Sequence, residues 1–243
     1  MARLHVTPAP RALFLAACSI CPEIMQGATA RKAGPHIEQN LWTELAACIL
    51  GSRMRYETAT SALERLLGAG LLDIDYLFRS GSRAVKAIAA ALRSLPRADG
   101  GVASYPFPTL RAKQIRDSYD AIYREGGSLI DMLNRPETGP QVRRHLVAKA
   151  AGIGPKQASL FLRNVGHSDD LAVLDVHVLR YMHLMGLREP EDVPRTLTRY
   201  EIIERELRCH ADQAGYSLGC FDFAVWVVMR AFSPPSRRPV CAS

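Results

Sequence analysis

Apolar residues recur along most of the chain at the three- and four-residue spacing of helices that bury one face. The clearest examples are residues 41–49, 63–67, 158–165, 178–185 and 202–207. Residues 223–229 form a more uniformly apolar segment, which is typical of a buried helix. Strict alternation of apolar and polar positions, which marks half-buried strands, is nearly absent. The pattern predicts an all-α fold.

Two stretches interrupt the helical pattern. Residues 96–108 are rich in glycine and proline and are predicted to form a loop or linker. Residues 233–243 contain three prolines and few large apolar residues, so we expect a disordered C-terminal tail. Residues 1–36 carry only a weak helical pattern and are interpreted as an N-terminal extension. The main domain is therefore expected to span residues 37–232.

The balance of charge favours a polyanionic partner. Lys and Arg outnumber Asp and Glu by 31 to 24, which gives a net charge of +7 and a pI of about 9.3. Such an excess suits nucleic acid. The six cysteines include one Cys-x-x-Cys pair, Cys18 and Cys21, and neither a second pair nor a run of four. We therefore expect no zinc, no iron–sulfur cluster and no other cofactor.

No segment predicts export or membrane insertion. Leu15 to Cys18 is similar to a lipoprotein cleavage box, but the apolar stretch from Ala12 to Ala17 has six residues. A signal sequence needs about 7–15 apolar residues, and a membrane span needs about 18. Scattered cysteines are typical of a reducing compartment. We expect a cytoplasmic, nucleoid-associated monomer that does not bind membranes.

A tight turn between two predicted helices carries the first functional signal. Gly152, Ile153 and Gly154 form the turn, and Pro155 occupies the first turn of the next helix, where its missing N–H costs nothing. Glycine lets the backbone approach a phosphate, and the N–H groups that open the next helix point at the anion. Residues 141–166 thus predict a helix–hairpin–helix that grips the DNA backbone without reading sequence. An ordinary helical corner is the simpler alternative.

Lys156 and Asp175 are the candidate catalytic residues. Lys156 lies in the first turn of the second hairpin helix, where the helix dipole disfavours the ammonium form. A Schiff-base nucleophile must be uncharged, although a phosphate-binding or solvated lysine is the alternative. Asp175 follows an apolar run and precedes the helix from Val176, so it is predicted to be an N-cap. An N-cap is held rigidly, as a catalytic carboxylate must be.

Gly152 to Lys156, followed by Leu174 to His177, resembles the helix–hairpin–helix DNA glycosylase superfamily, and most closely its archaeal-type 8-oxoguanine DNA glycosylase/AP lyases. The resemblance extends over residues 38–231. It implies two packed helical subdomains with the active site in the cleft between them. It also implies that Lys156 attacks the sugar C1′ with the help of Asp175, and that the partner is double-stranded DNA containing a damaged base.

The damaged base must leave the helix stack before chemistry and needs a pocket with a flat wall and a few polar groups. The candidates for this base pocket are Phe161, Asp222, Phe223 and Trp226. Core packing is the alternative role for Trp226, and starting the closing helix is the alternative for Asp222.

The gap left in the duplex must also be filled. The resemblance places the plug directly after the helix at 41–50, and the candidates are Ser52, Arg53, Met54 and Arg55. A solvated loop is the alternative. Diffuse attraction to phosphates is expected from Arg111, Lys113, Arg143 and Arg144.

Three functional hypotheses remain open at this stage. The first is a bifunctional glycosylase and AP lyase that removes 8-oxoguanine. The second is a glycosylase of the same fold that acts on another modified base. The third is a DNA-binding module without catalysis, which the presence of both Lys156 and Asp175 disfavours. The motif acts on the sugar and therefore does not identify the damaged base. The chain also continues to Ser243, past the point where the relatives end and use their chain end to bind the base. The sequence therefore predicts the reaction more firmly than the identity of the base.

Overall fold

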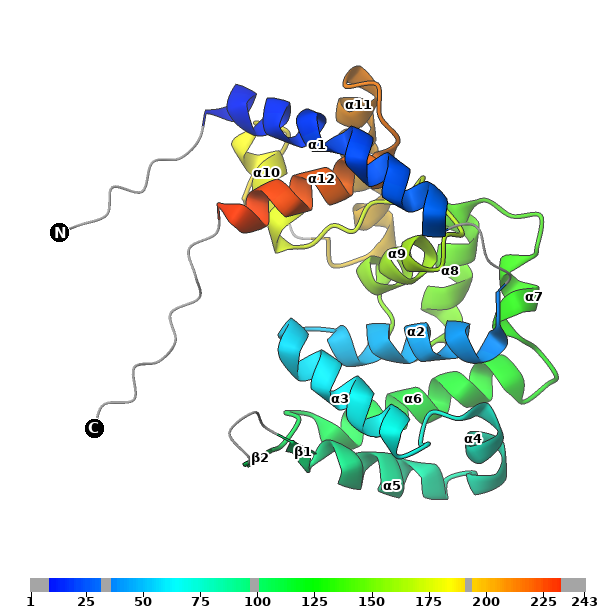
Figure 1. The fold of residues 1–243 in the computed structure, drawn as a ribbon. Helices are drawn as coiled ribbons and strands as arrows, with labels where there is room; N and C mark the ends of the chain where they lie inside the picture. The colour runs from blue at the N-terminus through cyan, green and yellow to red at the C-terminus, as the bar shows by residue number, and fades with distance from the viewer. Residues whose placement is uncertain (1–8, 32–35, 97–100, 191–193, 233–243) are drawn as a thin grey trace, which may run out of the picture. The chain divides into compact units, whose positions relative to one another are not determined.

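The computed structural model describes residues 9–31, 36–96, 101–190 and 194–232 (Figure 1). Helices dominate these ranges, which confirms the all-α prediction. The helices are α1 (Pro10–Arg31), α2 (Glu38–Gly51), α3 (Tyr56–Gly68), α4 (Ile74–Ser80), α5 (Arg83–Leu92), α6 (Pro108–Tyr123), α7 (Leu129–Leu133), α8 (Gly139–Lys149), α9 (Pro155–Asn164), α10 (Val176–Leu184), α11 (Leu197–Gln213) and α12 (Leu218–Ala231). The predicted tail at 233–243 lies outside the described residues.

The chain divides into two compact units, each with its own core. Residues 29–171 form one, which we call the hairpin unit because it contains α8 and α9. Residues 1–28 and 172–243 form the other, the terminal unit. The predicted boundary at residue 36 falls between α1 and α2.

The helix α2 is central to the hairpin unit. It packs against α3, α6, α7 and α9 (Figure 1). Trp42 of α2 is completely buried, and its ring meets the rings of Tyr119 and Tyr123 edge-on, with centroids 5.7 Å apart in both pairs. Edge-to-face aromatic pairs add to the stabilisation from burial alone. The apolar periodicity that predicted this helix therefore marks its buried face.

The terminal unit assembles α1 with α10, α11 and α12. Leu13, Ala17 and Cys21 of α1 are buried in the same cluster as residues of the last three helices. The weak helix predicted near the N-terminus is thus a 22-residue helix that contributes to a core. It continues past Pro22, which can donate no hydrogen bond to the preceding turn.

The predicted loop at 96–108 requires a small correction. Leu95–Pro96 (β1) and Val102–Ala103 (β2) form a two-residue antiparallel ladder, with Leu95 opposite Ala103. Strands of two residues are too short to produce an alternating pattern, so no sequence pattern marks them.

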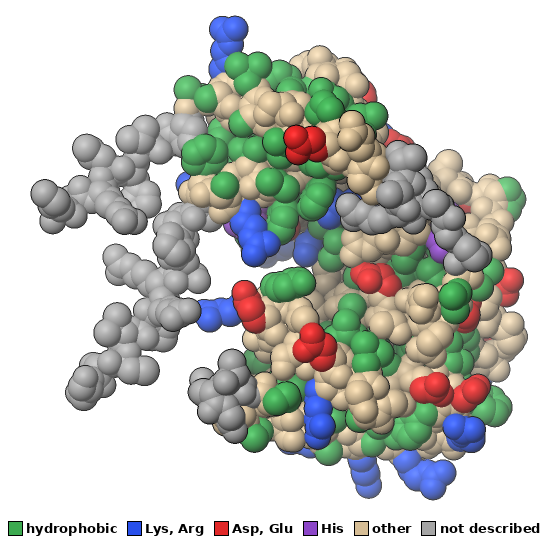
Figure 2. Space-filling view, viewed as in Figure 1, with side chains coloured by type: hydrophobic (Ala, Val, Ile, Leu, Met, Phe, Trp, Pro, Cys, Tyr) green, Lys and Arg blue, Asp and Glu red, His purple; other side chains and the backbone are tan. Residues whose placement is uncertain are grey.

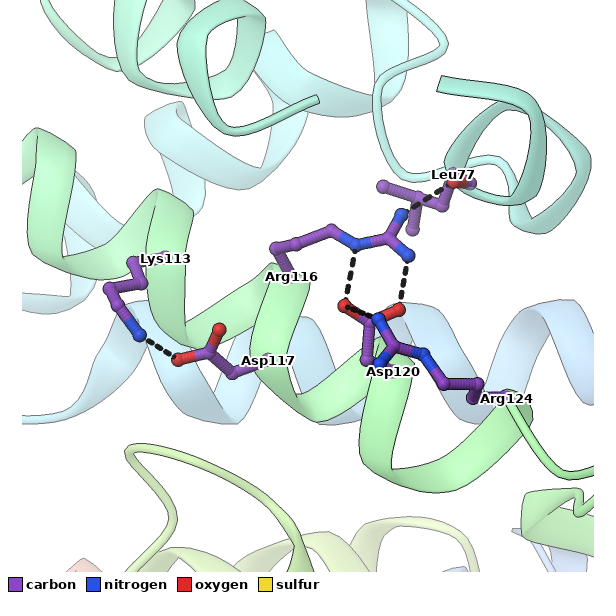
Figure 3. A network of polar contacts seen from close by, with 6 residues as sticks. All are labelled: Leu77, Lys113, Arg116, Asp117, Asp120 and Arg124. Carbon is purple, nitrogen blue, oxygen red and sulfur yellow. Dashed lines mark hydrogen bonds and ion pairs between the residues drawn. The ribbon is translucent and has the colours of Figure 1, made fainter. Parts of the chain in front are cut away.

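Arg116 ties α6 to α4 inside the hairpin unit (Figure 3). Its side chain is 8% exposed, and it donates one hydrogen bond to the Leu77 carbonyl at 2.5 Å and two to the Asp120 carboxylate. The hydrogen bonds from Arg116 are the main reason that the pKa of Asp120 lies below its usual range. One turn earlier, Lys113 pairs with Asp117 at 2.5 Å in an exposed position.

Replacement of Arg116 by Met should therefore destabilise the protein, because it removes three hydrogen bonds of a buried side chain. The Leu77 carbonyl would keep the longer bond from the Gly81 N–H, and Asp120 would keep its ion pair with the exposed Arg124. We expect the free energy of unfolding to fall by about 1–3 kcal/mol in urea denaturation. Lys113→Met on the same helix is the matched control and should change it by less than about 1 kcal/mol, as for other exposed pairs. Equal losses in the two variants would contradict this assignment.

Candidate active site

The structure confirms the two predicted helices and the turn between them. α8 ends at Lys149, α9 begins at Pro155, and Gly154 is the N-cap of α9. Ile153 is buried between them at 4% exposure. The first N–H groups of α9 have no partners within the helix, so they are available to an anion. Phosphate binding by this turn remains a prediction.

The two glycines of the turn meet different constraints. Gly152 has φ +82°, and a Cβ atom added there would lie 2.6 Å from Cδ of Gln114. Gly154 has φ −95°, and a Cβ atom there would meet nothing within 4 Å. The fold therefore requires glycine at 152. At 154 nothing in the described part of the chain requires glycine, so space remains there for a ligand to approach the backbone.

Lys156 lies in the first turn of α9 and is partly exposed. Its amine forms no hydrogen bond or ion pair with the described part of the chain. Its charge does act on the buried Cys48 thiol of α2: burial, the largest effect, and Glu44 raise the pKa of Cys48, whereas Lys156 lowers it. The amine is thus near the end of α2 without being neutralised by a carboxylate.

Asp175 is the N-cap of α10, as predicted. Its Oδ1 accepts hydrogen bonds from the backbone N–H groups of His177 at 2.8 Å and Val178 at 3.0 Å. Its Oδ2 receives no hydrogen bond from the described residues. One oxygen therefore fixes the carboxylate, and the other remains open to a ligand.

The extended residues before Asp175 are held by α11. The Tyr200 hydroxyl donates to the Ala172 carbonyl at 2.7 Å and accepts from the Leu174 N–H at 3.0 Å. Glu204 accepts from the Ala172 N–H at 2.9 Å. Sequence reasoning missed these two side chains, because their partners lie 26 to 32 residues away and no local pattern marks them.

The plug candidates follow the end of α2 directly. Ser52 is the C-cap of α2, Met54 is partly buried, and Arg55 is the exposed N-cap of α3. Arg53 is exposed and has φ +60°, which makes it the one non-glycine residue with a left-handed backbone among those described. Such a conformation is costly for an arginine and is often found at functional sites.

The base-pocket candidates separate by exposure. Phe161 is completely buried in the hairpin unit and Asp222 is 1% exposed in the terminal unit. Asp222 does not start a helix, because α12 begins at Leu218. Phe223 and Trp226 are partly exposed and stack with centroids 5.7 Å apart, and the Arg230 guanidinium lies 5.0 Å from the Trp226 ring. These two rings are the members of the set that offer a surface to a base.

The expectation of diffuse phosphate attraction is wrong for two of the four residues. Arg111 is 5% exposed and Arg143 is completely buried, with a hydrogen bond from Arg143 to the Ser159 hydroxyl at 3.1 Å. Neither can reach a phosphate at the surface. On the face shown in Figure 2, basic side chains lie singly or in small groups among acidic and apolar ones.

Known proteins match this arrangement. A family model described as 8-oxoguanine DNA glycosylase matches residues 30–216, well over half of the chain. The chain belongs to the 8-oxoguanine DNA glycosylase family. Curated relatives of this glycosylase include the 8-oxoguanine DNA glycosylase/AP lyase of Thermotoga maritima, 31% identical over 79% of this chain and 81% of the relative. The protein of the same name from Methanocaldococcus jannaschii is 30% identical over 64% of this chain and 74% of its own.

Solved structures share the fold of this glycosylase. The crystal structure of the Thermotoga maritima 8-oxoguanine DNA glycosylase aligns with a TM-score of 0.68 and 29% identity, covering 90% of this chain and 94% of that one. The Methanocaldococcus jannaschii glycosylase/lyase in complex with 15mer DNA containing 8-oxoguanine aligns with a TM-score of 0.64 and 24% identity, covering 88% and 90%. The predicted helix–hairpin–helix glycosylase fold is confirmed.

The described residues contain neither a membrane-spanning helix nor a cluster of metal ligands. None of the helices in the described ranges is long and apolar enough to cross a membrane. Within those same ranges, His, Cys, Asp and Glu side chains do not gather in threes as a metal ion would require.

The two glycines of the hairpin should respond differently to replacement by alanine. Gly152→Ala should lower the free energy of unfolding by about 1–2 kcal/mol, because alanine is strained at positive φ. Gly154→Ala should leave stability unchanged and weaken binding to undamaged duplex by several-fold, because the added methyl group faces the proposed phosphate. Thermal unfolding and duplex titrations would measure both. Tight duplex binding by Gly154→Ala would rule out phosphate contact at this turn.

Proposed function

We propose that this chain is a base-excision repair enzyme that removes 8-oxoguanine from duplex DNA and then cleaves the strand at the abasic site. The activity in the names of its relatives supports this, and one of them has been crystallised on DNA containing 8-oxoguanine. The observation that carries the proposal is the amine of Lys156, which stands without a partner from the described residues at the start of the second hairpin helix.

Lys156 is the nucleophile in this proposal. An uncharged amine attacks C1′ of the damaged nucleotide, and the N-glycosidic bond breaks as its electron pair leaves with the base, which takes up a proton. Opening of the sugar ring then gives an imine between the lysine and C1′. Loss of a proton from C2′ expels the 3′-phosphate and cuts the strand, and water releases the lysine.

Asp175 supplies negative charge in the same reaction. Positive charge develops on the sugar as the base departs, and a fixed carboxylate stabilises it without reorganising. The cap geometry supports this role, because Oδ1 is occupied by two backbone N–H groups while Oδ2 remains open.

The remaining parts of the proposal concern the DNA. The turn at Gly152, Ile153 and Gly154 binds the backbone, residues 52–55 fill the gap in the duplex, and Phe223 with Trp226 provides the wall for the displaced base. The protein acts as a monomer on DNA in the cytoplasm. The net charge of +7 supports the choice of partner.

The roles of Lys156 and Asp175 can be separated by two changes that each replace a charged group with a neutral polar one. Lys156→Gln should abolish both strand cleavage and borohydride trapping, yet keep duplex affinity, which comes from many phosphate contacts. Asp175→Asn should slow base excision by about 10²–10³-fold, the usual effect of removing one stabilising group. It should hardly change thermal stability, because Asn caps a helix about as well as Asp.

Single-turnover assays on duplexes with one 8-oxoguanine would measure these rates. Lys149→Gln, at the end of the first hairpin helix, is the matched control and should excise and trap like the wild type. Retention of trapping by Lys156→Gln would remove Lys156 from the mechanism. Excision of a different modified base but not 8-oxoguanine would leave the chemistry in place and change the substrate.

Trp226 can be tested by comparing two substrates. Trp226→Ala should slow excision of 8-oxoguanine by about tenfold or more, as loss of base stacking typically costs about 1–3 kcal/mol. Cleavage at a pre-formed abasic site should be nearly unaffected, because no base is present to stack. Val227→Ala, on the same helix and also exposed, should affect neither. A parallel loss of both activities in Trp226→Ala would assign the ring to core packing.

A further inference from the structure

The last turn of α2 has four backbone carbonyl groups that the helix cannot pair internally. Two are satisfied locally: Ile49 accepts from the Ser52 N–H and Gly51 accepts from the Met54 N–H, both at 3.3 Å. The other two are satisfied by side chains from distant segments. Gln157 donates to the Cys48 carbonyl at 2.5 Å, and the Tyr105 hydroxyl donates to the Leu50 carbonyl at 2.6 Å. The end of this helix is therefore fixed by tertiary contacts.

The chain then turns sharply. The bond from Met54 to Gly51 and the dihedral angles of Ser52, φ −67° and ψ 115°, are those of a type II turn. Such a turn places its third residue at positive φ, where glycine is preferred. Here that residue is Arg53, with φ +60°. Its exposed side chain has no hydrogen bond or ion pair with the described residues.

A residue in this conformation persists only when its surroundings hold it there. Arg111 is the side chain that binds directly to the turn at residues 51–54. It is 5% exposed, and its guanidinium donates to the Ser52 carbonyl at 2.5 Å and to Oε1 of Gln114 at 2.7 Å. The pKa of Tyr105 is raised, chiefly by burial, and the neighbouring Arg111 opposes that shift. The hydrogen bonds of Tyr105 and Arg111 place both side chains at the end of α2.

Gln114, which accepts from Arg111, also lies beside the hairpin turn. The amide group of Gln114 lies where a side chain on Gly152 would stand, with a Cβ atom at 2.6 Å from its Cδ. Arg111 thus lies between the turn at 51–54 and the hairpin turn, in direct contact with the first and separated from the second by Gln114. All of these residues belong to the hairpin unit.

We propose that Arg111 is a positioning residue, which holds the peptide between Ser52 and Arg53 so that Arg53 is presented to the duplex in a preset conformation. The inference rests on the proposed role of residues 52–55 as the plug. It gives the buried Arg111 a function other than attraction to phosphates at the surface. It also names Arg53, among the four plug candidates, as the one whose side chain enters the gap.

The test is the preference of the full-length protein for a gapped duplex. We would measure the affinity for a duplex with a single tetrahydrofuran abasic analogue, and for the same duplex undamaged, and take the ratio. Arg53→Ala should lower this ratio by about tenfold, the scale of one lost arginine contact. Arg111→Met should lower it by a similar factor, and the double variant should be no worse than either single one.

Arg116→Met is the matched control, because Arg116 is a second buried arginine of α6 that donates to a helix-end carbonyl elsewhere. It should reduce stability but keep the wild-type ratio, and Arg53→Ala should retain its full effect in that background. If circular dichroism finds Arg111→Met unfolded, Arg111→Lys replaces it. The lysine lacks the forked donor set, so its ratio should lie between those of wild type and Arg53→Ala.

The outcomes are distinguishable. Arg111 does not position the turn if Arg53→Ala lowers the ratio while a folded Arg111 variant keeps the wild-type ratio. The same holds if the double variant lowers the ratio by the product of the two single effects. In both cases the plug role of Arg53 stands. If Arg53→Ala leaves the ratio unchanged, the plug role itself fails and this inference fails with it, while the chemistry of Lys156 is untouched.

Discussion

The four carbonyl groups that α2 cannot pair within its own last turn are the constraint around which the hairpin unit is organised. A buried carbonyl without a donor costs about 1–3 kcal/mol, so each must find a partner. One partner is Gln157, the residue after Lys156, and its bond to Cys48 fixes the first turn of α9 against α2. The position of Lys156, the proposed nucleophile, therefore depends on the need of the α2 carbonyl groups for hydrogen-bond donors.

The terminal unit prepares its catalytic group by a different route. Asp175 caps α10 with one oxygen, and the segment before it is anchored to Tyr200 and Glu204. In both units the functional side chain stands at a helix N-terminus. The backbone geometry at the start of α9 and of α10 therefore fixes the positions of both groups.

Much of this could be predicted from the sequence, because the features involved are local. Glycine and proline around residue 154 mark the hairpin, and an aspartate ahead of an apolar helix marks a cap. The burial of Arg111 and Arg143 could not be predicted, because an arginine in an amphipathic pattern normally faces water. Arg111 finds its carbonyl 59 residues away, and that distance along the chain leaves no periodic trace. The left-handed conformation of Arg53 is hidden for the same reason.

Peptide mapping of the borohydride-reduced adduct tests most directly whether Lys156 supplies the nucleophile. The wild-type protein would be reacted with a duplex containing 8-oxoguanine, reduced during turnover, digested with protease and nuclease, and analysed by mass spectrometry. The account predicts a deoxyribose-derived remnant on the peptide that contains Lys156 and on no other. A remnant on another amine, or efficient excision by water without any adduct, would contradict it.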